Sequence, residues 1–420
     1  MTSKTLRALC ISLLLVSPVL PAHSAPPAAA APLTLQQAVE QARLSNPSLM
    51  AARKHVSATR STEITAGLRQ NPNLTLLGQG VTLPDINPIG NPYYYSANFS
   101  RLFERGQKRR WRLDSATATV DVTESQYSDQ ERQVVLSVRQ AFTNLLVAKE
   151  AVALSNENLT DYRKTVALTK ARLDAGDIPR NDYERVDLQL AQFESDADNA
   201  TLNMMQASAQ LRVLLGIDGS VRTIDIVGTL DPPVIQTNVS ELEARALASR
   251  PDYLAAQQSV RLAEANAKYA IAGGTADPTV AAEYERSGID NTFGVSVAIP
   301  LRIFDRNQGE KERTRFEIDS SKFALVAAHN QVVSDVDQAW FALDAALRQA
   351  HRYNDHYLEE AGRVRDNLQF SYRNGNATLL DYLEALRDYR AVHLSSLNAN
   401  AQVWLAIHQL SYATATDIVP

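Results

Sequence analysis

The 420-residue sequence contains one cysteine, Cys10, and it lies within a short apolar stretch, 8–16, near the N-terminus. Basic residues precede this stretch, and the small residues Ala22 and Ser24 fit a cleavage site. We therefore expect residues 1–24 to be a secretory signal peptide. An uncleaved anchor helix is disfavoured, because the stretch is shorter than the roughly 20 residues of a bilayer span. Without the signal no thiol remains, which excludes disulfides and cysteine-based metal sites.

Long hydrophobic runs are also missing. After a tether of only alanine and proline at 25–32, no segment has 18 consecutive apolar residues, which argues against a transmembrane helix. An exported chain without such a helix resides in the periplasm, in the medium, or in an outer membrane as a β-barrel. The formal net charge is −5, so nucleic acid is not expected as a partner.

The motifs of enzyme chemistry do not occur: there is no G-x-S-x-G, H-E-x-x-H, P-loop or G-x-G-x-x-G. The histidines after the signal are scattered, and His351 and His356 are badly spaced for one metal on a helix. Only four methionines occur, so no soft-metal relay is visible. We expect a protein that is not an enzyme and has no cofactor and no resident metal site.

What the sequence does contain is a duplication. Asp182-Tyr183 recurs as Asp381-Tyr382, and a glycine, Gly176 or Gly375, precedes each pair by the same interval. Matching apolar stripes follow the pairs, at positions 183, 186, 190, 193, 197, 200, 204, 207 and 211, and at 382, 385, 389, 392, 396, 399, 403, 406 and 410. A period of this size indicates a doubled domain and not a short solenoid repeat.

Each half of the duplication, 33–232 and 237–420, contains two candidate strands after its first helices. Residues 293–301 alternate large apolar with small or polar residues, which is typical of a strand with one apolar face. The four expected strands cover about 73–83, 93–103, 279–287 and 292–301. Tyr93, Tyr95 and Phe99 share one face, which suits a membrane interface. A soluble hairpin packed on a helix would show the same alternation, so the two readings stay open on this pattern alone.

Long helices follow the strands. Apolar residues recur at strict intervals of three and four from 138 to 173, and again from 333 to 368. A sustained 3.5-residue period predicts coiled-coil packing with a left-handed supercoil. We expect two helical hairpins, at about 110–215 and 310–412. The first ascending helix would be about 90–100 Å long, which is the size of a spacer or a tube wall.

The hairpin tips carry turn signals. Gly176 and Gly375 are expected as left-handed C-caps of the ascending helices. Asp177 in the first tip, and Asn376 or Thr378 in the second, are candidate N-caps of the returning helices. The basic cluster 108–112, which includes Trp111, lies just after a strand, and anchoring at lipid phosphates is favoured for it over nucleic-acid binding.

The strand count implies an oligomer. Four strands cannot close a barrel, and open sheet edges are not tolerated in lipid. A dimer would supply eight strands, whose interior fills with side chains, whereas a trimer supplies twelve and an open lumen. The same symmetry would arrange the helical hairpins as a closed ring.

The chain resembles the TolC-type outer-membrane efflux factors over its mature length. The resemblance rests on the doubled layout, on the Asn/Arg-Pro helix starts, and on tip motifs with Arg172-Leu173-x-x-Gly176 and Tyr372-x-x-Gly375, each followed by Asp-Tyr. The segments 103–109 and 299–309 are most similar to the cobalt–zinc–cadmium resistance branch, although Arg302-Ile303 departs from the Pro-Leu common there.

This resemblance implies a mainly α protein with a small β part: a homotrimeric channel-tunnel with an α-barrel of helical hairpins and a 12-stranded transmembrane β-barrel. It implies an outer-membrane location with the helices in the periplasm. It also implies a periplasmic adaptor protein and an inner-membrane pump of the resistance-nodulation-division type as partners. Residues at the tips would contact the adaptor: Arg172, Leu173, Gly176, Ile178, Arg373 and Gly375.

The resemblance also implies a closed periplasmic gate. Asp381 and Glu384 match acidic positions at the family's constriction, and their spacing of three puts both on one helical face. Tyr372 and Asp182 match a tyrosine–aspartate hydrogen bond between hairpins. The arginine of a second family contact falls on Ala377, so that contact is absent here.

The expected function is a passive exit duct for substrates delivered by the pump and the adaptor, with heavy-metal cations as the expected cargo. Drug efflux or type I secretion through the same duct is the alternative, because the pump chooses the cargo. A periplasmic coiled-coil scaffold without a pore is the remaining alternative.

Overall fold

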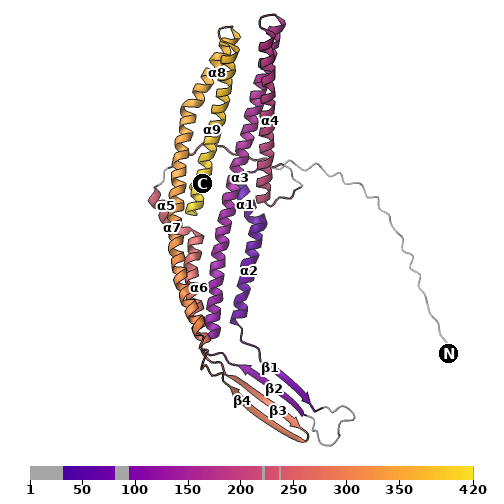
Figure 1. Ribbon diagram of the computed structural model, residues 1–420, viewed down its shortest axis with the longest axis vertical. Coiled ribbons are helices and arrows are strands. Elements are labelled where there is room, and N and C mark those ends of the chain that lie inside the picture. Colours follow the sequence, from indigo (N-terminus) through magenta and orange to yellow (C-terminus); the bar gives the residue numbers. More distant parts are fainter. Residues whose placement is uncertain (1–31, 81–93, 220–222, 236–237, 420) are drawn as a thin grey trace, which may run out of the picture.

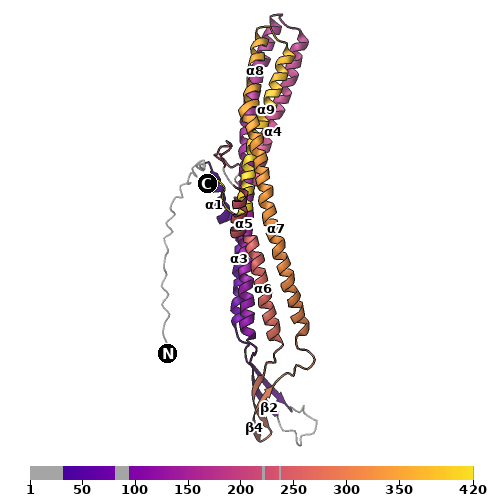
Figure 2. The same cartoon turned by 90° about the vertical axis from the view of Figure 1, so that its left-hand side faces the viewer.

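The computed structural model describes residues 32–80, 94–219, 223–235 and 238–419. The expected signal peptide and the tether up to residue 31 lie outside the described residues. The molecule is elongated, with a β-sheet at one end and the tips of two helical hairpins at the other (Figures 1 and 2). The C-terminal end lies near mid-height (Figure 1). Among the described helices, none is both long enough and apolar enough to cross a membrane.

Two successive sets of elements repeat one order. The first set comprises α1 (Leu35–Ser45), α2 (Pro47–Gly67), β1 (Asn73–Gln79), β2 (Tyr94–Leu102), α3 (Lys108–Asp174) and α4 (Arg180–Leu214). The second comprises α5 (Val239–Ser249), α6 (Pro251–Gly273), β3 (Thr279–Ser287), β4 (Asp290–Ala298), α7 (Gln308–Arg352), the π-helix η1 (Tyr353–Tyr357), α8 (Leu358–Arg373) and α9 (Leu379–Thr414). The expected fold class, long helical hairpins with four strands, is confirmed.

The strands differ slightly from their expected bounds. β1 ends at Gln79, and the expected continuation at 81–83 lies outside the described residues, as does Tyr93. β4 begins at Asp290 and ends at Ala298, short of the expected residue 301. Pro300 has no N–H to donate to a neighbouring strand, which is consistent with the earlier end.

The four strands form one antiparallel sheet in the order β1-β2-β3-β4. Phe99 pairs with both Leu74 and Ala282, and Ala282 pairs with Val295, so these residues share one face. Because side chains alternate along a strand, the register gives that face Leu74, Leu76, Tyr95, Ala97, Phe99, Val280, Ala282, Tyr284, Phe293, Val295 and Val297. The pairing thus joins the separate alternations into one mainly apolar face, with Arg101 at its helix end and Arg286 near the opposite end.

The opposite face of the sheet is polar. It carries mostly serine, threonine, asparagine and glutamine side chains, and its charged residues are Glu283, Glu285 and Asp290. The apolar and aromatic residues on it are Leu77, Tyr94, Leu102, Ala281 and Ala298. No lysine or arginine of the described strands lies on it, because Arg101 and Arg286 belong to the apolar face. The sheet therefore separates an apolar surface from an acidic one.

The helices pack as the 3.5-residue period predicted. Every position of the stripe on α3 from 138 to 173 is buried or half-buried, and so is every position of the stripes on α4 and α9. α3 contacts α4 along the first hairpin and α9 of the second, so the two hairpins lie side by side (Figure 1). With 67 residues, α3 is about 100 Å long.

The second ascending helix departs from the expectation. The stripe was expected to run unbroken from 333 to 368, but the π-helix η1 interrupts it at Tyr353–Tyr357. Ala350 and Tyr353 pack in the core below, the next partly buried position is Leu358, and Tyr357 and Val364 are exposed. A π-turn holds one more residue than an α-turn, so it rotates the buried face by one position. Placing Tyr357 and Val364 on the stripe was wrong for this reason.

Candidate functional site at the hairpin tips

Both hairpin tips use the same backbone turn. Gly176 and Gly375 have φ of +82° and +76°, and an added Cβ would meet no atom within 4 Å, so the demand for glycine is conformational and not steric. The N–H of Gly176 donates to the carbonyl of Leu173, and that of Asp177 to Arg172, which is the Schellman arrangement. Gly375 and Asn376 form the equivalent bonds at the end of α8. The expected left-handed C-caps are confirmed.

The starts of the returning helices differ between the tips. Thr378 caps α9 in a capping box: its side chain accepts from the N–H of Asp381, and Asp381 accepts from the N–H of Thr378. Thr378 was one of the two expected caps. The expectation that Asp177 caps the returning helix of the first hairpin was wrong. That helix, α4, begins only at Arg180, with Pro179 at the N-cap position and no side-chain cap. The second tip therefore has the better-capped returning helix.

An aromatic cluster joins the hairpins below the tips. Tyr162 of α3 stacks on Phe193 of α4, with ring centroids 4.1 Å apart, and Tyr372 of α8 stacks on Tyr382 of α9 at 5.6 Å. Thr165 of α3 hydrogen-bonds the hydroxyl of Tyr382 at 3.2 Å, so the first hairpin contacts the second directly. All four rings are almost completely buried.

Polar contacts reinforce this cluster. The Tyr162 hydroxyl donates to the carbonyl of Val186, and burial, followed by the nearby Tyr382, raises the pKa of Tyr162. Arg390 of α9 forms an ion pair with Asp196 of α4 and lies over the ring of Phe193, 4.2 Å from its centroid. Thr165 and Arg390 were not among the residues expected here from the sequence, because no spacing rule shows which residues of two distant helices lie at the same height.

Tyr372 is 6% exposed, and the guanidinium of Arg172 lies over its ring, 5.4 Å from the centroid. Asp182 is half-buried in the first turn of α4. Within the part of the chain that the structure describes, no hydrogen bond joins Tyr372 to Asp182. In a single chain Tyr372 instead contacts Arg172 and Tyr382, and the gate role of Tyr372 and Asp182 stays a prediction.

Asp381 and Glu384 lie on one exposed face of α9, one turn apart. Hydrogen bonds from the hydroxyl and N–H of Thr378 lower the pKa of Asp381, which keeps this carboxylate charged. The side chain of Glu384 forms no hydrogen bond and no ion pair with another described residue. The two carboxylates therefore differ: Asp381 helps to start the helix, whereas Glu384 is free to meet solvent or a neighbouring chain.

The expected adaptor-contacting residues gather at the two tips. Gly176, Arg373 and Gly375 are exposed, whereas Arg172, Leu173 and Ile178 are half-buried. Among the described residues, no group of three or more histidine, cysteine, aspartate or glutamate side chains could hold a metal ion. The chemistry available at the tips is thus packing, hydrogen bonding and surface charge.

Long helical hairpins that rise from one four-stranded sheet define the class of channel-tunnel proteins of bacterial outer membranes. A family model described as outer membrane efflux protein matches residues 38–217 and 242–416. The chain belongs to this family, and the two matched segments cover most of the two structural repeats, from within α1 to just past α4 and from within α5 to just past α9.

Individual relatives span nearly the whole chain. The cobalt-zinc-cadmium resistance protein CzcC of Cupriavidus metallidurans is 25% identical over 389 residues, covering 91% of this chain and 90% of that protein. A membrane protein from Pseudomonas aeruginosa has a similar structure, with a TM-score of 0.77, 20% identity, and coverage of 90% of this chain and 92% of that one. CusC superimposes with a TM-score of 0.76 at 18% identity, covering 90% and 91%.

The family assignment fixes the general function. The chain is an efflux channel of the outer membrane whose helical part lies in the periplasm, and channels of this family are passive and not enzymes. They are trimers that work with adaptor proteins and inner-membrane pumps. This excludes the scaffold without a pore that the sequence left open.

Proposed function

We propose that this channel is the exit duct of a tripartite efflux system for heavy-metal cations. The observation that carries the proposal is the polar face of the sheet, which holds Glu283, Glu285 and Asp290 and no basic residue of the described strands. In a trimer this face would line the exit with nine carboxylates. Acidic rings attract cations into a pore and disfavour anions. Similarity to the CzcC protein over 91% of this chain supports the same cargo.

Assembly into a trimer would use the two lateral edges of the chain. Neither β1 nor β4 has a partner on its outer side among the described strands, and unpaired edges are costly in lipid. On the β4 side, α7 exposes Phe316 and Phe323. On the β1 side, α2 and α4 expose Ile64 and Leu188. Exposed apolar side chains on both edges fit a ring in which each chain contacts the next.

The periplasmic gate would form where the three second hairpins meet. Asp381 and Glu384 of three chains would make a ring of six carboxylates, which fits entry of cations. Tyr372 and Asp182 would hold the tips in the closed arrangement. The tip residues Arg172, Leu173, Gly176, Ile178, Arg373 and Gly375 would contact the adaptor, and a resistance-nodulation-division pump would supply the cargo.

The test is metal tolerance in a deletion strain of the native host. We expect lower tolerance and higher cell content of cobalt, zinc, cadmium or nickel, restored by the wild-type gene. The double variant Glu283→Gln/Glu285→Gln should restore it only partly and should lower the cation selectivity of the pore. A Glu312→Gln/Glu317→Gln variant on α7 removes the same charge outside the sheet and serves as the control.

Unchanged tolerance to all four metals in the deletion strain would contradict the metal assignment. Increased sensitivity to dyes and antibiotics in that strain would instead support drug efflux through the same duct.

A further inference from the structure

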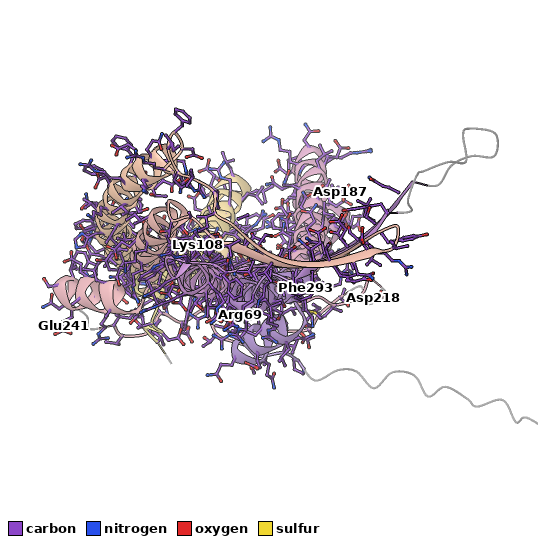
Figure 3. All side chains as sticks on the ribbon, turned by 90° about the horizontal axis from the view of Figure 1, so that it is seen from below. Arg69, Lys108, Asp187, Asp218, Glu241 and Phe293 are labelled. Carbon is purple, nitrogen blue, oxygen red and sulfur yellow. The ribbon has the colours of Figure 1, made fainter. Side chains whose placement is uncertain are left out.

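The junction between sheet and helices in the first repeat holds a cavity of about 700 Å³. It lies among the end of α2, the end of β2 and the start of α3, and its lining includes Arg69, Arg101, Arg109 and Arg110. In Figure 3, seen from the strand end, Arg69 and Lys108 lie near the point where the sheet joins the helices, and Phe293 lies further out along the sheet.

The charges that line this cavity are not balanced. Of the ionic groups at its wall, Lys108 forms an ion pair with Asp277 at 2.6 Å, and Glu104 with Arg112 at 2.6 Å. The four arginines of the lining have no carboxylate partner among the described residues. Four guanidinium groups therefore share a hollow whose one acidic residue is already paired.

The equivalent junction in the second repeat does not have this excess of positive charge. Gln107 and Asn307, each just before its long helix, have φ of +59° and +62°, so the two junctions are equivalent. Residues 105–112 contain five basic and no acidic residues, whereas the equivalent residues 305–312 contain two basic and three acidic ones. In the second repeat Arg313 pairs with Glu310. The excess charge thus belongs to the first junction and not to the fold.

The position of the cavity indicates what its ligand is. Arg101 lies on the apolar face of the sheet, at the helix end, on the same face as Phe99 and Tyr95. Since the helices are periplasmic, this is the height of the headgroups of the periplasmic leaflet. Phe103 and Trp111, which lie beneath the guanidinium groups of Arg101 and Arg110, suit such an interface.

We propose that this cavity, lined by Arg69, Arg101, Arg109 and Arg110, binds the phosphodiester headgroup of an anionic glycerophospholipid of the periplasmic leaflet. One guanidinium group can donate two parallel hydrogen bonds to two oxygens of a phosphate. Several guanidinium groups around one cavity favour an anionic headgroup over a zwitterionic one, because their positive charges add. The acyl chains would lie along the apolar face of the sheet beside Phe99. The site depends on the outer-membrane location and not on the cargo, so it stands or falls separately from metal transport.

The test is lipid binding to the purified full-length trimer in detergent, followed by native mass spectrometry. Phosphatidylglycerol is the probe, phosphatidylcholine with the same chains is the zwitterionic comparison, and inorganic phosphate is the soluble competitor. We expect one retained phosphatidylglycerol per protomer, at least tenfold weaker retention of phosphatidylcholine, and no displacement by millimolar phosphate. Equal retention of the two lipids, or displacement by inorganic phosphate, overturns the proposal.

Variants locate the site. Arg69→Gln and Arg109→Gln each change an exposed side chain and should each weaken phosphatidylglycerol binding about fivefold. The triple variant Arg69→Gln/Arg101→Gln/Arg109→Gln should abolish selective retention. Arg180→Gln/Arg185→Gln/Arg387→Gln removes the same charge at the hairpin ends and should bind like wild type. Wild-type binding by both single variants contradicts the assignment, whether or not the triple variant assembles.

Discussion

The guanidinium of Arg172, at the tip of the first hairpin, lies over the ring of Tyr372 in the second, 5.4 Å from the ring centroid. Tyr372 in turn stacks on Tyr382, with the two ring planes only 6° apart. The two tips of one chain are therefore joined by a stack of a cation and two aromatic rings. Any movement that separates the hairpins must break the contact between Arg172 and Tyr372.

Replacing Arg172 should loosen the closed tips. A cation–π contact at a partly exposed site contributes about 0.5–1 kcal/mol, so Arg172→Gln should raise the open population about two- to fivefold. We expect a higher open probability in planar bilayers and greater sensitivity of cells to vancomycin. Arg180→Gln is the control, because among the described residues Arg180 pairs only with Glu184 on its own helix. Equal conductance of the Arg172→Gln and Arg180→Gln channels would show that the stack does not restrain the tips.

The two acidic residues of the predicted gate can be separated from their structural role. Glu384→Gln removes a charge that no described residue pairs with, so it should lower cation selectivity without changing stability. Asp381→Ala removes a charge and half of the capping box, and loss of such a cap costs about 0.5–2 kcal/mol. Thr378→Ala removes the cap and keeps both carboxylates.

Ion conductance and thermal unfolding should therefore group the three variants in two different ways, with Asp381→Ala belonging to both groups. Asp381→Ala and Glu384→Gln should share the altered ion selectivity, whereas Asp381→Ala and Thr378→Ala should share the lower melting temperature. Altered selectivity in Thr378→Ala alone would show that helix capping, and not carboxylate charge, controls ion passage.

The π-helix predicts a tolerated deletion. Removing Asp355, an exposed residue of η1, should convert the π-turn to an α-turn and leave the buried faces of α7 and α8 in register with α9. Deleting Asp344 from the regular part of α7 should instead rotate every later residue by about 100° and expose the core. We expect the first variant, and not the second, to yield trimers on a native gel. Failure of the Asp355 deletion to assemble would mean that the π-turn itself is needed.

Acid should destabilise the channel through His408. This side chain is 3% exposed on α9 and hydrogen-bonds Thr143 at 3.0 Å. Burial, together with the charge of Arg139 and against that of Asp417, lowers the pKa of His408 to about 4. Because the unfolded value is about 6.5, the unfolded chain binds the extra proton, so this stability is present above pH 6.5 and is lost towards pH 4.

The expected loss at pH 5 is about 2 kcal/mol per protomer relative to pH 7.5. Melting temperatures of the detergent-purified trimer at the two pH values provide the measurement. His408→Gln should reduce the difference, whereas replacement of the exposed His55 should not. A pH dependence that survives in His408→Gln would place its origin in other groups.

Much of the fold could be read from the sequence because its signals are periodic. The stripe from 138 to 173 and the alternation at 293–301 repeat often enough to reveal their period, and Gly176 and Gly375 mark turns that need a positive φ. The break at Tyr353–Tyr357 could not be read in the same way. A single π-turn has no characteristic residue type. It becomes visible only when the buried positions before it are compared with those after it.

The sequence by itself therefore determined the doubled domain, the long hairpins and the strand alternation, because each depends on residues close together in the chain. The tertiary structure decided which surfaces those elements make together. Only the strand register unites Phe99 with Val295 on one face and isolates Glu283 on the other, and only the packing of the first hairpin against the second brings Arg172 of α3 to Tyr372 of α8. Contacts between residues some two hundred positions apart depend on the relative height and rotation of the helices and strands that hold them. The local spacing of residues in the sequence determines neither quantity.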